Sequence, residues 1–313
     1  MGRHGLSRPA GAIRRQCPPP HDVWQRDLLT GTLALSLEIP AGQFVSPATG
    51  RLGLIGYGGA PAAGQEAREE IVAQRAATSG GVPVLPGSGI KGAVRTIFEL
   101  LSFSCDPLLH GSGCTPQACC DACSVFGRLG YNGRVSFSDA VAAAPPSGVR
   151  VEVRRVPIPW PPKASTTPGD FRIYDLEEAT FREPGRQTVQ KQPGVLAREV
   201  YIGTFETRMT FCNLDPQELG RILLALGLGT DRSTRFLLRL GGVKYDGKGA
   251  VKVVPSHLRL VTPRVRTREG LEACGEECAA WIRAARTSEW AAAFWPTLEQ
   301  LAPLLYPAPR ASA

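Results

Sequence analysis

Cysteine is the residue type whose spacing in this sequence predicts chemistry most directly. Nine cysteines are present, and five of them fall close together: Cys105, Cys114, Cys119, Cys120 and Cys123. Cys120 and Cys123 form a CxxC knuckle, and loops of this length can bring Cys105 and Cys114 beside it. Four thiolates arranged in this way bind Zn²⁺ in closed sites of structural type. We predict a structural zinc ion held by Cys105, Cys114, Cys120 and Cys123. Cys119 and His110 are alternative ligands, and a set of reduced, buried thiols is the alternative without metal.

A glycine-rich turn opening a helix is the second candidate site. Ser88 is placed to cap a helix predicted over 88–102, whose first amide groups and dipole attract anions. Lys91 and Arg95 are four residues apart, so they lie on one face of that helix. Ser88, Lys91 and Arg95 are therefore predicted to hold phosphate groups. An ordinary capped helix with two solvated cations is the alternative, and a Walker phosphate loop is excluded because its spacing is absent.

A second glycine-rich segment covers residues 240–249. Its glycines, Gly242 among them, permit positive φ and close backbone approach to a ligand. Lys244 and Lys248 add positive charge, and Tyr245 offers a ring for base stacking. This combination favours contact with an RNA backbone. The alternative is a glycine-rich hairpin without a ligand.

The elements that must position these segments follow from local patterns. Alternation predicts strands at 32–39, 134–137, 149–156 and 203–211, and closing strands at 250–254 and 257–261. Asp215, Pro216 and Glu218 begin a second helix with an N-cap, an N1 proline and an N3 glutamate. The order strand, helix, strand, strand, helix, strand is typical of an α+β fold of the ferredoxin-like or RRM-like kind. In such folds one face of the sheet often meets single-stranded RNA.

Longer segments without clear periodicity surround these elements. We expect residues 1–27 to form a flexible basic arm, and 41–81 to form a long loop with a short helix at 66–75. Repeated prolines argue against regular structure in the insertion 157–195. The single domain is predicted to span 28–262, with the zinc loop at 105–123 inside it, and 263–313 reads as a helical tail.

Overall composition limits the class of protein. Lys and Arg number 36 against 28 Asp and Glu, a net charge of +8, which fits a polyanionic partner. No apolar run is long enough for a transmembrane helix, and no secretory signal is evident. The odd cysteine count with one tight cluster favours a reducing compartment, so we expect a cytoplasmic protein.

Four segments in this order resemble the RAMP superfamily of CRISPR-associated proteins. The matching segments are the Pro-Gly-Ser turn at 86–88 with the Lys-Gly-x-x-Arg helix, the cysteine-rich loop that ends in Phe-Gly at 126–127, the Gly-Arg-Val-x-Phe-Ser-Asp-Ala strand at 133–140, and the Gly-Gly-x-x-x-x-Gly-x-Gly loop at 241–249. The resemblance extends over roughly 28–262 and is greatest to the backbone subunits of type III effector complexes.

This resemblance implies a role for each segment. Ser88, Lys91 and Arg95, with the closing glycine loop, contact guide phosphates, while the insertion 157–195 acts as a thumb wedged into the guide–target duplex. The thumb cations are Arg172, Arg182, Arg186 and Lys191. The implied partners are CRISPR RNA, target RNA, other effector subunits and further copies of this chain, in antiviral defence.

Some relatives of this type also cut target RNA, using an aspartate in the loop after the first strand. In this sequence the matching loop, 41–59, contains no acidic residue to hold a divalent ion. Asp170, Asp175 and Asp246 are the remaining weak candidates, and no spacing selects among them. We therefore lean toward a non-catalytic protein. The alternatives are a Mg²⁺-dependent endoribonuclease that cuts target RNA and a guide-processing RAMP nuclease, for which the histidines lie outside the expected site.

Overall fold

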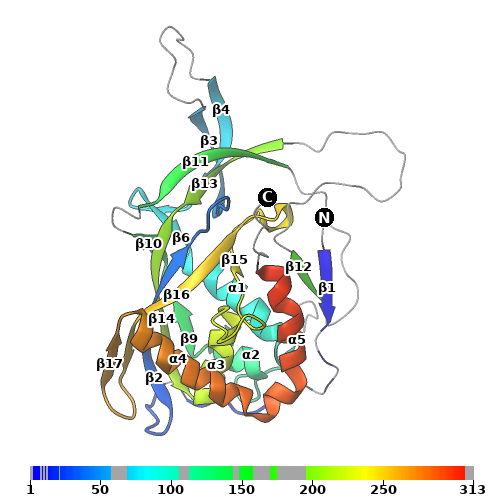
Figure 1. Cartoon of the computed structure of the whole chain (residues 1–313), viewed down its shortest axis with the longest axis vertical. Coiled ribbons are helices and arrows are strands. Elements are labelled where there is room, and N and C mark those ends of the chain that lie inside the picture. Colours follow the sequence, from blue (N-terminus) through cyan, green and yellow to red (C-terminus); the bar gives the residue numbers. More distant parts are fainter. Residues whose placement is uncertain are drawn as a thin grey trace, which may run out of the picture.

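The chain is described by a computed structural model for residues 3–7, 9, 11, 13–20, 22–57, 69–105, 113–143, 148–157, 170–174 and 195–306. A curved, mostly antiparallel sheet forms the centre of the molecule (Figure 1). Its principal strands are β2 (Leu29–Glu38), β9 (Val135–Phe137), β14 (Thr204–Leu214) and β16 (Ala250–Leu260). The edges are extended by β5 (Thr78–Ser79), β6 (Val82–Leu85), β10 (Ala140–Ala142), β15 (Leu238–Arg239) and β17 (Arg266–Glu269).

Two helices connect the principal strands of this sheet. Helix α1 (Gly87–Leu100) lies in the chain between β2 and β9, and helix α3 (Pro216–Ala225) lies between β14 and β16. In the sheet, β16 pairs with β2, β2 with β14, and β14 with β9, all antiparallel. This is the split βαβ arrangement, which agrees with the predicted α+β class of ferredoxin-like type. The two predicted closing strands are one strand, β16, with a register shift between Pro255 and His257.

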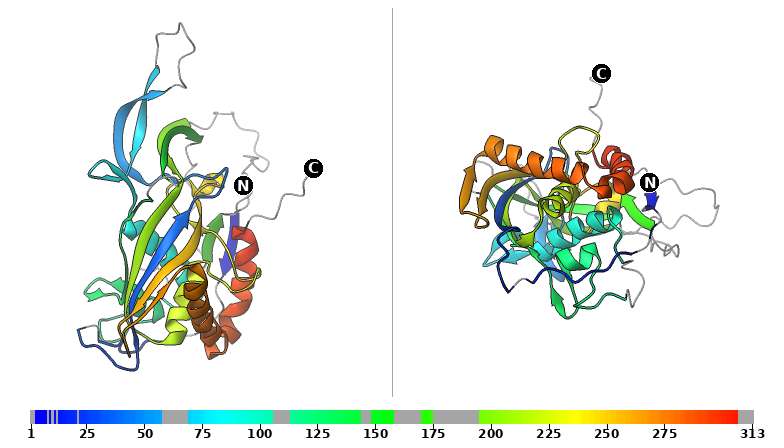
Figure 2. Two further views of the ribbon diagram at one scale, coloured as in Figure 1. Left: turned by 60° about the vertical axis from the view of Figure 1, so that its left-hand side comes forward. Right: turned by 90° about the horizontal axis from the view of Figure 1, so that it is seen from below.

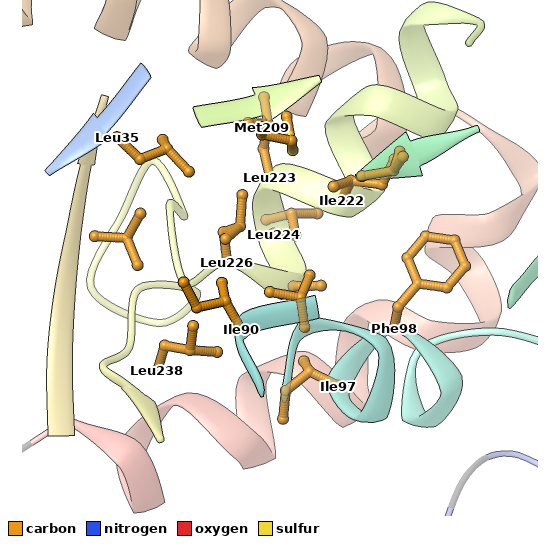
Figure 3. Close-up of a cluster of buried hydrophobic side chains, with 14 of the residues drawn as sticks. Leu35, Ile90, Ile97, Phe98, Met209, Ile222, Leu223, Leu224, Leu226 and Leu238 are labelled. Carbon is orange, nitrogen blue, oxygen red and sulfur yellow. The ribbon is translucent and has the colours of Figure 1, made fainter. Parts of the chain in front are cut away.

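The core lies between the sheet and the helices. Along β2, Leu33, Leu35 and Leu37 are buried while the intervening residues are partly exposed, as alternation requires. Figure 3 shows side chains of α1, including Ile90, Ile97 and Phe98, gathered with side chains of α3 around Met209 and Leu35. Burial of this shared apolar stripe fixes α1 against the sheet.

A buried ion pair joins β9 to the start of α3. The side chain of Arg134 has no exposed surface, and it donates hydrogen bonds to Glu218 Oε2 at 2.9 Å and to the carbonyl of Asn213 at 2.7 Å. The predicted cap is confirmed, because Asp215 Oδ1 accepts from the amide of Glu218 at 2.8 Å and Glu218 accepts in return from Asp215. One glutamate thus serves both the capping box and the ion pair.

A second, four-stranded sheet extends away from the helices (Figures 1 and 2). Its order is β11 (Arg150–Pro157), β13 (Val195–Ile202), β4 (Glu69–Ala76) and β3 (Ala48–Tyr57). The expectation of a loop with a helix at 66–75 is wrong, because β3 and β4 form an antiparallel hairpin. Backbone pairing of β4 with strands on both sides outweighs the helical propensity of its charged residues.

The N-terminal arm and the proline-rich insertion also contain strands. β1 (Arg3–Ser7) pairs antiparallel with β12 (Asp170–Tyr174). The predicted arm at 1–27 is therefore not wholly flexible, and the insertion 157–195 is not wholly irregular. The side chains of Phe171 and Ile173 alternate along β12, and both are buried.

The predicted C-terminal tail is mostly helical, but it begins with β17, which pairs with β16 of the central sheet. α4 (Leu271–Arg286) packs on α3 and β16, and α5 (Glu289–Leu305) follows it. α3 and α4 approach closely because Gly220 has no side chain, and a Cβ there would lie 2.1 Å from the carbonyl oxygen of Trp281. None of the described helices is long and apolar enough to cross a membrane.

Candidate nucleic-acid interface and metal centre

Four cysteines converge beside α1, as the spacing predicts. The Sγ atoms of Cys105, Cys114, Cys120 and Cys123 all lie within 4.8 Å of one another, and all four residues are buried. The short helix α2 (Asp121–Phe126) orients Cys123, and Cys120 is its N-cap residue. Backbone amides point at the sulfurs: the amide of Cys105 donates to Cys120 Sγ and that of Cys120 donates to Cys114 Sγ.

The donor set fits zinc. In a tetrahedral site with Zn–S bonds of about 2.3 Å, neighbouring sulfurs are about 3.8 Å apart, and Cys105 Sγ lies 3.5 Å from Cys123 Sγ. Hydrogen bonding with Cys105 and Cys120, followed by burial, raises the pKa of the Cys123 thiol. A bound cation stabilises the thiolate forms that such a cluster otherwise disfavours. These four residues can therefore hold a metal such as zinc.

The alternative ligands are resolved only in part. Cys119 is adjacent to the cluster but its thiol donates to the carbonyl of Thr115 at 3.0 Å, and it does not belong to the group of converging sulfurs. His110 lies outside the described residues. Within the described part of the chain, no other group of three or more His, Cys, Asp or Glu side chains is close enough to hold an ion.

Arg95 joins α1 to this cysteine cluster. Its Nε donates to Glu99 Oε1 at 2.7 Å, its Nη1 to the carbonyl of Gly127 at 2.9 Å, and its Nη2 to Cys123 Sγ at 3.9 Å. A positive guanidinium beside a cysteine ligand offsets the negative charge of a four-thiolate site. Sequence reasoning assigns Arg95 only to phosphate, and it misses this contact because the contact depends on tertiary placement.

The start of α1 is fixed from outside the helix. The N-cap residue is Pro86. The expectation that Ser88 caps the helix is therefore wrong, because Ser88 is the second residue within the helix and its side chain is exposed. Instead Asp139 Oδ1 accepts from the amide of Gly87 at 2.8 Å. A Cβ at Gly87 would lie 2.3 Å from the carbonyl oxygen of Phe137, so glycine is required for this close approach.

Lys91 differs from Arg95 in having no partner among the described residues. It forms no ion pair or side-chain hydrogen bond with any described residue. Burial, and after it the positive charge of Arg95, lowers the pKa of Lys91 below its usual value. A half-buried ammonium without a counter-ion is stabilised by an incoming anion. Lys91 is therefore a side chain of α1 that an anion would stabilise in its charged form.

The segment 240–249 folds back onto the loop after β2. The amide of Gly242 donates to the carbonyl of Ser46 at 3.0 Å, and the amide of Gly249 donates to the carbonyl of Phe44 at 2.9 Å. Gly241 and Gly249 have φ of +82° and +90°, and a Cβ at Gly249 would lie 2.2 Å from the carbonyl oxygen of Leu240. The glycines are thus required by close packing within the protein.

The charged and aromatic residues of this segment are placed in different ways. The ring of Tyr245 is only 9% exposed, packed with Val156, Val243 and Phe44, so it does not offer the open stacking face that the sequence predicts. Lys248 Nζ donates to the carbonyl of Gly42 at 3.3 Å. Gly242 is exposed, and Lys244 is partly buried.

A small pocket of about 120 Å³ lies between the segment 240–249 and α1. Lys244 and Arg239 line it together with Ala93 and Thr96 of α1. Burial, followed by the charge of Arg239, lowers the pKa of Lys244. Arg239 itself braces the segment by donating to the carbonyls of Lys244 and Gly247 at 2.8 and 3.2 Å. Two cation-bearing segments that are far apart in the sequence therefore adjoin.

Arg198 is a further residue that the sequence reasoning does not assign to the site. Its Nη1 lies 2.8 Å from the position that a Cβ of Gly242 would occupy, and its buried Nε has no hydrogen-bond partner among the described residues. Its charge also acts on Tyr245. The guanidinium of Arg198 therefore lies against Gly242. The two residues are far apart in the sequence, so no local pattern predicts this contact.

The remaining predicted residues are not brought into the site. Arg182, Arg186, Lys191 and Asp175 lie outside the described residues, and only the backbone of Asp170 and Arg172 is described, in β12. Asp246 ends the short 3₁₀ helix Lys244–Asp246, and its amide donates to the carbonyl of Val243. None of these placements identifies a catalytic carboxylate.

Comparison with protein families agrees with this geometry. The family model of the RAMP superfamily matches residues 43–252, from the loop after β2 to the start of β16. This match covers more than half of the chain, which therefore belongs to the RAMP superfamily. Membership indicates a CRISPR-associated function in RNA binding. A search of curated proteins finds no match.

Proposed function

We propose that this protein is a CRISPR RNA-binding backbone subunit of a type III effector complex. In this role it holds the guide for pairing with target RNA, in antiviral defence in the cytoplasm. It is proposed to act without catalysing RNA cleavage, because the segment 41–59 that follows β2 contains no carboxylate.

The observation that carries this proposal is the half-buried ammonium of Lys91 on α1, which has no ion-pair or hydrogen-bond partner among the described residues and a lowered pKa. Lys244 adds a second cation near another side of the same helix, where it lines a pocket with Ala93 and Thr96. An RNA phosphate supplies the counter-ion that the protein does not. The exposed Ser88 is placed to add a hydroxyl. Arg95 has five N–H donors, three of which are engaged, so the others remain for a phosphate.

The second sheet supports contact with further subunits. Leu52, Leu54 and Val72 are exposed on its β3–β4 hairpin, and the register pairs Leu54 with Val72, so they share one face. Exposed apolar clusters of this kind mark protein–protein contacts. We propose copies of this chain or other effector subunits as the partners, while the insertion 157–195 contacts the guide–target duplex.

Binding of guide RNA by purified protein tests the proposal. Affinity should fall steeply as salt rises from about 50 to about 500 mM, because phosphate contacts release counter-ions. Lys91→Gln should weaken binding about equally for all RNA sequences and reduce the salt slope by about 0.7. Coexpression with a repeat–spacer array should leave processed guide RNA on the wild-type protein.

The control is Arg283→Gln, which removes one charge from the exposed face of α4, away from α1. It should leave the affinity and the salt slope unchanged. Affinity that is flat across the salt series, or equal loss in Lys91→Gln and Arg283→Gln, would rule out a guide site at α1.

A further inference from the structure

The face of the central sheet that the helices do not cover carries its own cations. Along β14, Phe205 and Met209 are fully buried in the core, whereas Glu206, Arg208 and Thr210 point to the opposite face and are exposed. On β16, Arg259 is exposed in the same way. β14, β2 and β16 run side by side (Figure 2, left view), so Arg208 and Arg259 flank the middle strand.

The register creates a trough between these two arginines. Arg208 and His257 lie opposite Ala34 on its two sides, and Arg259 lies opposite Thr32. The floor of Gly31, Thr32 and Ala34 is small, so the longer side chains of Arg208, His257 and Arg259 surround a hollow of about 590 Å³. β14 and β16 lie on either side of β2 and are therefore about 10 Å apart. The guanidinium groups of Arg208 and Arg259 can reach across this width.

The two arginines of this trough are not paired with acidic groups of the described residues. Neither Arg208 nor Arg259 has an ion-pair or side-chain hydrogen-bond partner in the described part of the chain. His257 Nδ1 lies 3.8 Å from Glu269 Oε1. The acidic Glu38 is at the other end of β2 and pairs with Lys252 at 2.8 Å. Glu206 shares the face but lies opposite Ser36, toward Glu38, so Arg208 and Arg259 are the charged groups nearest the end at Gly31.

We propose that this trough is a second RNA-binding site, in which Arg208 and Arg259 clamp phosphate groups over Thr32 and Ala34. The ligand class rests on the proposed function, but the site is distinct from the one at α1. No phenylalanine, tyrosine or tryptophan among the described residues lines the hollow. Binding is therefore through the backbone of RNA and independent of sequence.

The position of the trough connects it to the first site. The amide of Arg208 donates to Ser138 Oγ at 3.0 Å, and the next residue, Asp139, caps α1. An RNA chain held at the start of α1 can therefore continue over this edge onto the open face. An acidic protein segment is the less favoured ligand, because the trough continues the path of an RNA chain from the start of α1.

Fluorescence anisotropy with a labelled oligouridylate over about 0.1 to about 1 M salt tests the trough. With a slope of about 0.7 per contact, each lost phosphate contact costs about fivefold in affinity at 0.1 M salt. The double variant Arg208→Gln/Arg259→Gln should therefore bind about 25-fold more weakly and lower the slope by about 1.4. Ala34→Glu, which places a carboxylate on the floor without removing a cation, should also weaken binding.

The matched control is Arg232→Gln/Arg283→Gln, which removes two exposed charges elsewhere and should change neither quantity. All variants are compared after their circular dichroism and melting curves match wild type. If Lys91→Gln weakens binding while the trough variants equal the control, the trough is not an RNA site and the proposed function stands. If wild type shows no salt-dependent affinity, both proposals fail. An acidic partner would then be the ligand to examine.

Discussion

The body of the molecule, formed by the central sheet and its helices, differs from the second sheet in which side chains are buried and which are exposed. In the body, Arg134 is 2% exposed and its guanidinium is held by Glu218, Ser124 and the carbonyl of Asn213. In the second sheet, Leu52, Leu54 and Val72 are 65%, 66% and 57% exposed on the β3–β4 hairpin. Charge is enclosed in one region, and apolar surface is left open in the other.

This difference indicates that the body is stabilised by its own internal contacts, whereas the hairpin is suited to contact with another molecule. Removing one partner of a buried ion pair leaves an uncompensated charge, so the body depends on its own internal contacts. Exposed leucines contribute little to folding, and burying them releases about 25 cal/mol for each Å² removed from water. The body should therefore respond to mutation through stability, and the hairpin through association.

The largest effect is expected from losing the metal. Cys120→Ser removes one of four converging sulfurs, and structural zinc contributes about 10–16 kcal/mol of apparent binding free energy, which is comparable to the whole stability of a typical domain. We expect the variant to lose zinc and to unfold below the wild-type melting temperature. Elemental analysis and thermal melting measure both.

Cys119→Ser is the matched control. Its thiol bonds to the carbonyl of Thr115 instead of joining the cluster, so zinc content should stay at one equivalent. Less than about half an equivalent in the wild-type protein would exclude a zinc site, since thiolate sites bind the ion tightly.

The next effect is expected at the buried ion pair. Glu218→Gln leaves Arg134 buried and unpaired, which should reduce the free energy of unfolding by about 3–5 kcal/mol. Glu218→Gln combined with Arg134→Met should lose less than the sum of the single variants, because the stranded charge is then absent. Urea denaturation of the four proteins gives the coupling energy, and strict additivity would show that the pair is not coupled.

The same pair sets an acid limit on stability. Burial alone would raise the pKa of Glu218, but the hydrogen bonds and charge of Arg134 outweigh it and lower this pKa. A lowered pKa in the folded state means that the stabilisation is complete above the unfolded value, near 4.3, and is lost as pH falls through the folded value. Melting between neutral pH and this acid range should therefore show a steeper loss in wild type than in Glu218→Gln.

A smaller effect is expected at the cap of α3. Asp215→Ala removes the acceptor for the amide of Glu218, and the loss of such a cap costs about 1 kcal/mol. Gln217→Ala, an exposed neighbour, is the control and should change stability by less than about 0.5 kcal/mol. Equal losses in the two variants would show that the cap contributes nothing.

Elements with a complete local signal were predictable from sequence. The alternation of β2 and the Asp215 capping box each lie within a few residues, and the cysteine spacing predicted the four converging sulfurs while leaving Cys119 and His110 as alternatives. The hairpin β3–β4 was missed because β4 pairs with β13, and the amide of Ala76 bonds to Glu199, 123 residues later. The burial of Tyr245 and the contact of Arg95 with Cys123 were missed for the same reason: both depend on segments that only the folded chain brings together.

The smallest effect on stability, and the sharpest contrast, is expected at the hairpin. Leu52→Ser combined with Leu54→Ser should change the free energy of unfolding by less than about 1 kcal/mol, since exposed positions usually contribute within about 0.5 kcal/mol each. Leu35→Ala, at a buried position of β2, should cost about 2–5 kcal/mol.

Assembly should show the reverse order. Mass photometry of the protein mixed with guide RNA should show fewer copies per RNA for the hairpin variant than for wild type, because the apolar contact between neighbouring subunits is weakened. Leu35→Ala, measured below its melting temperature, should assemble as wild type does. Full assembly by the hairpin variant would show that these leucines contact no subunit and that the contrast between the two regions has another cause.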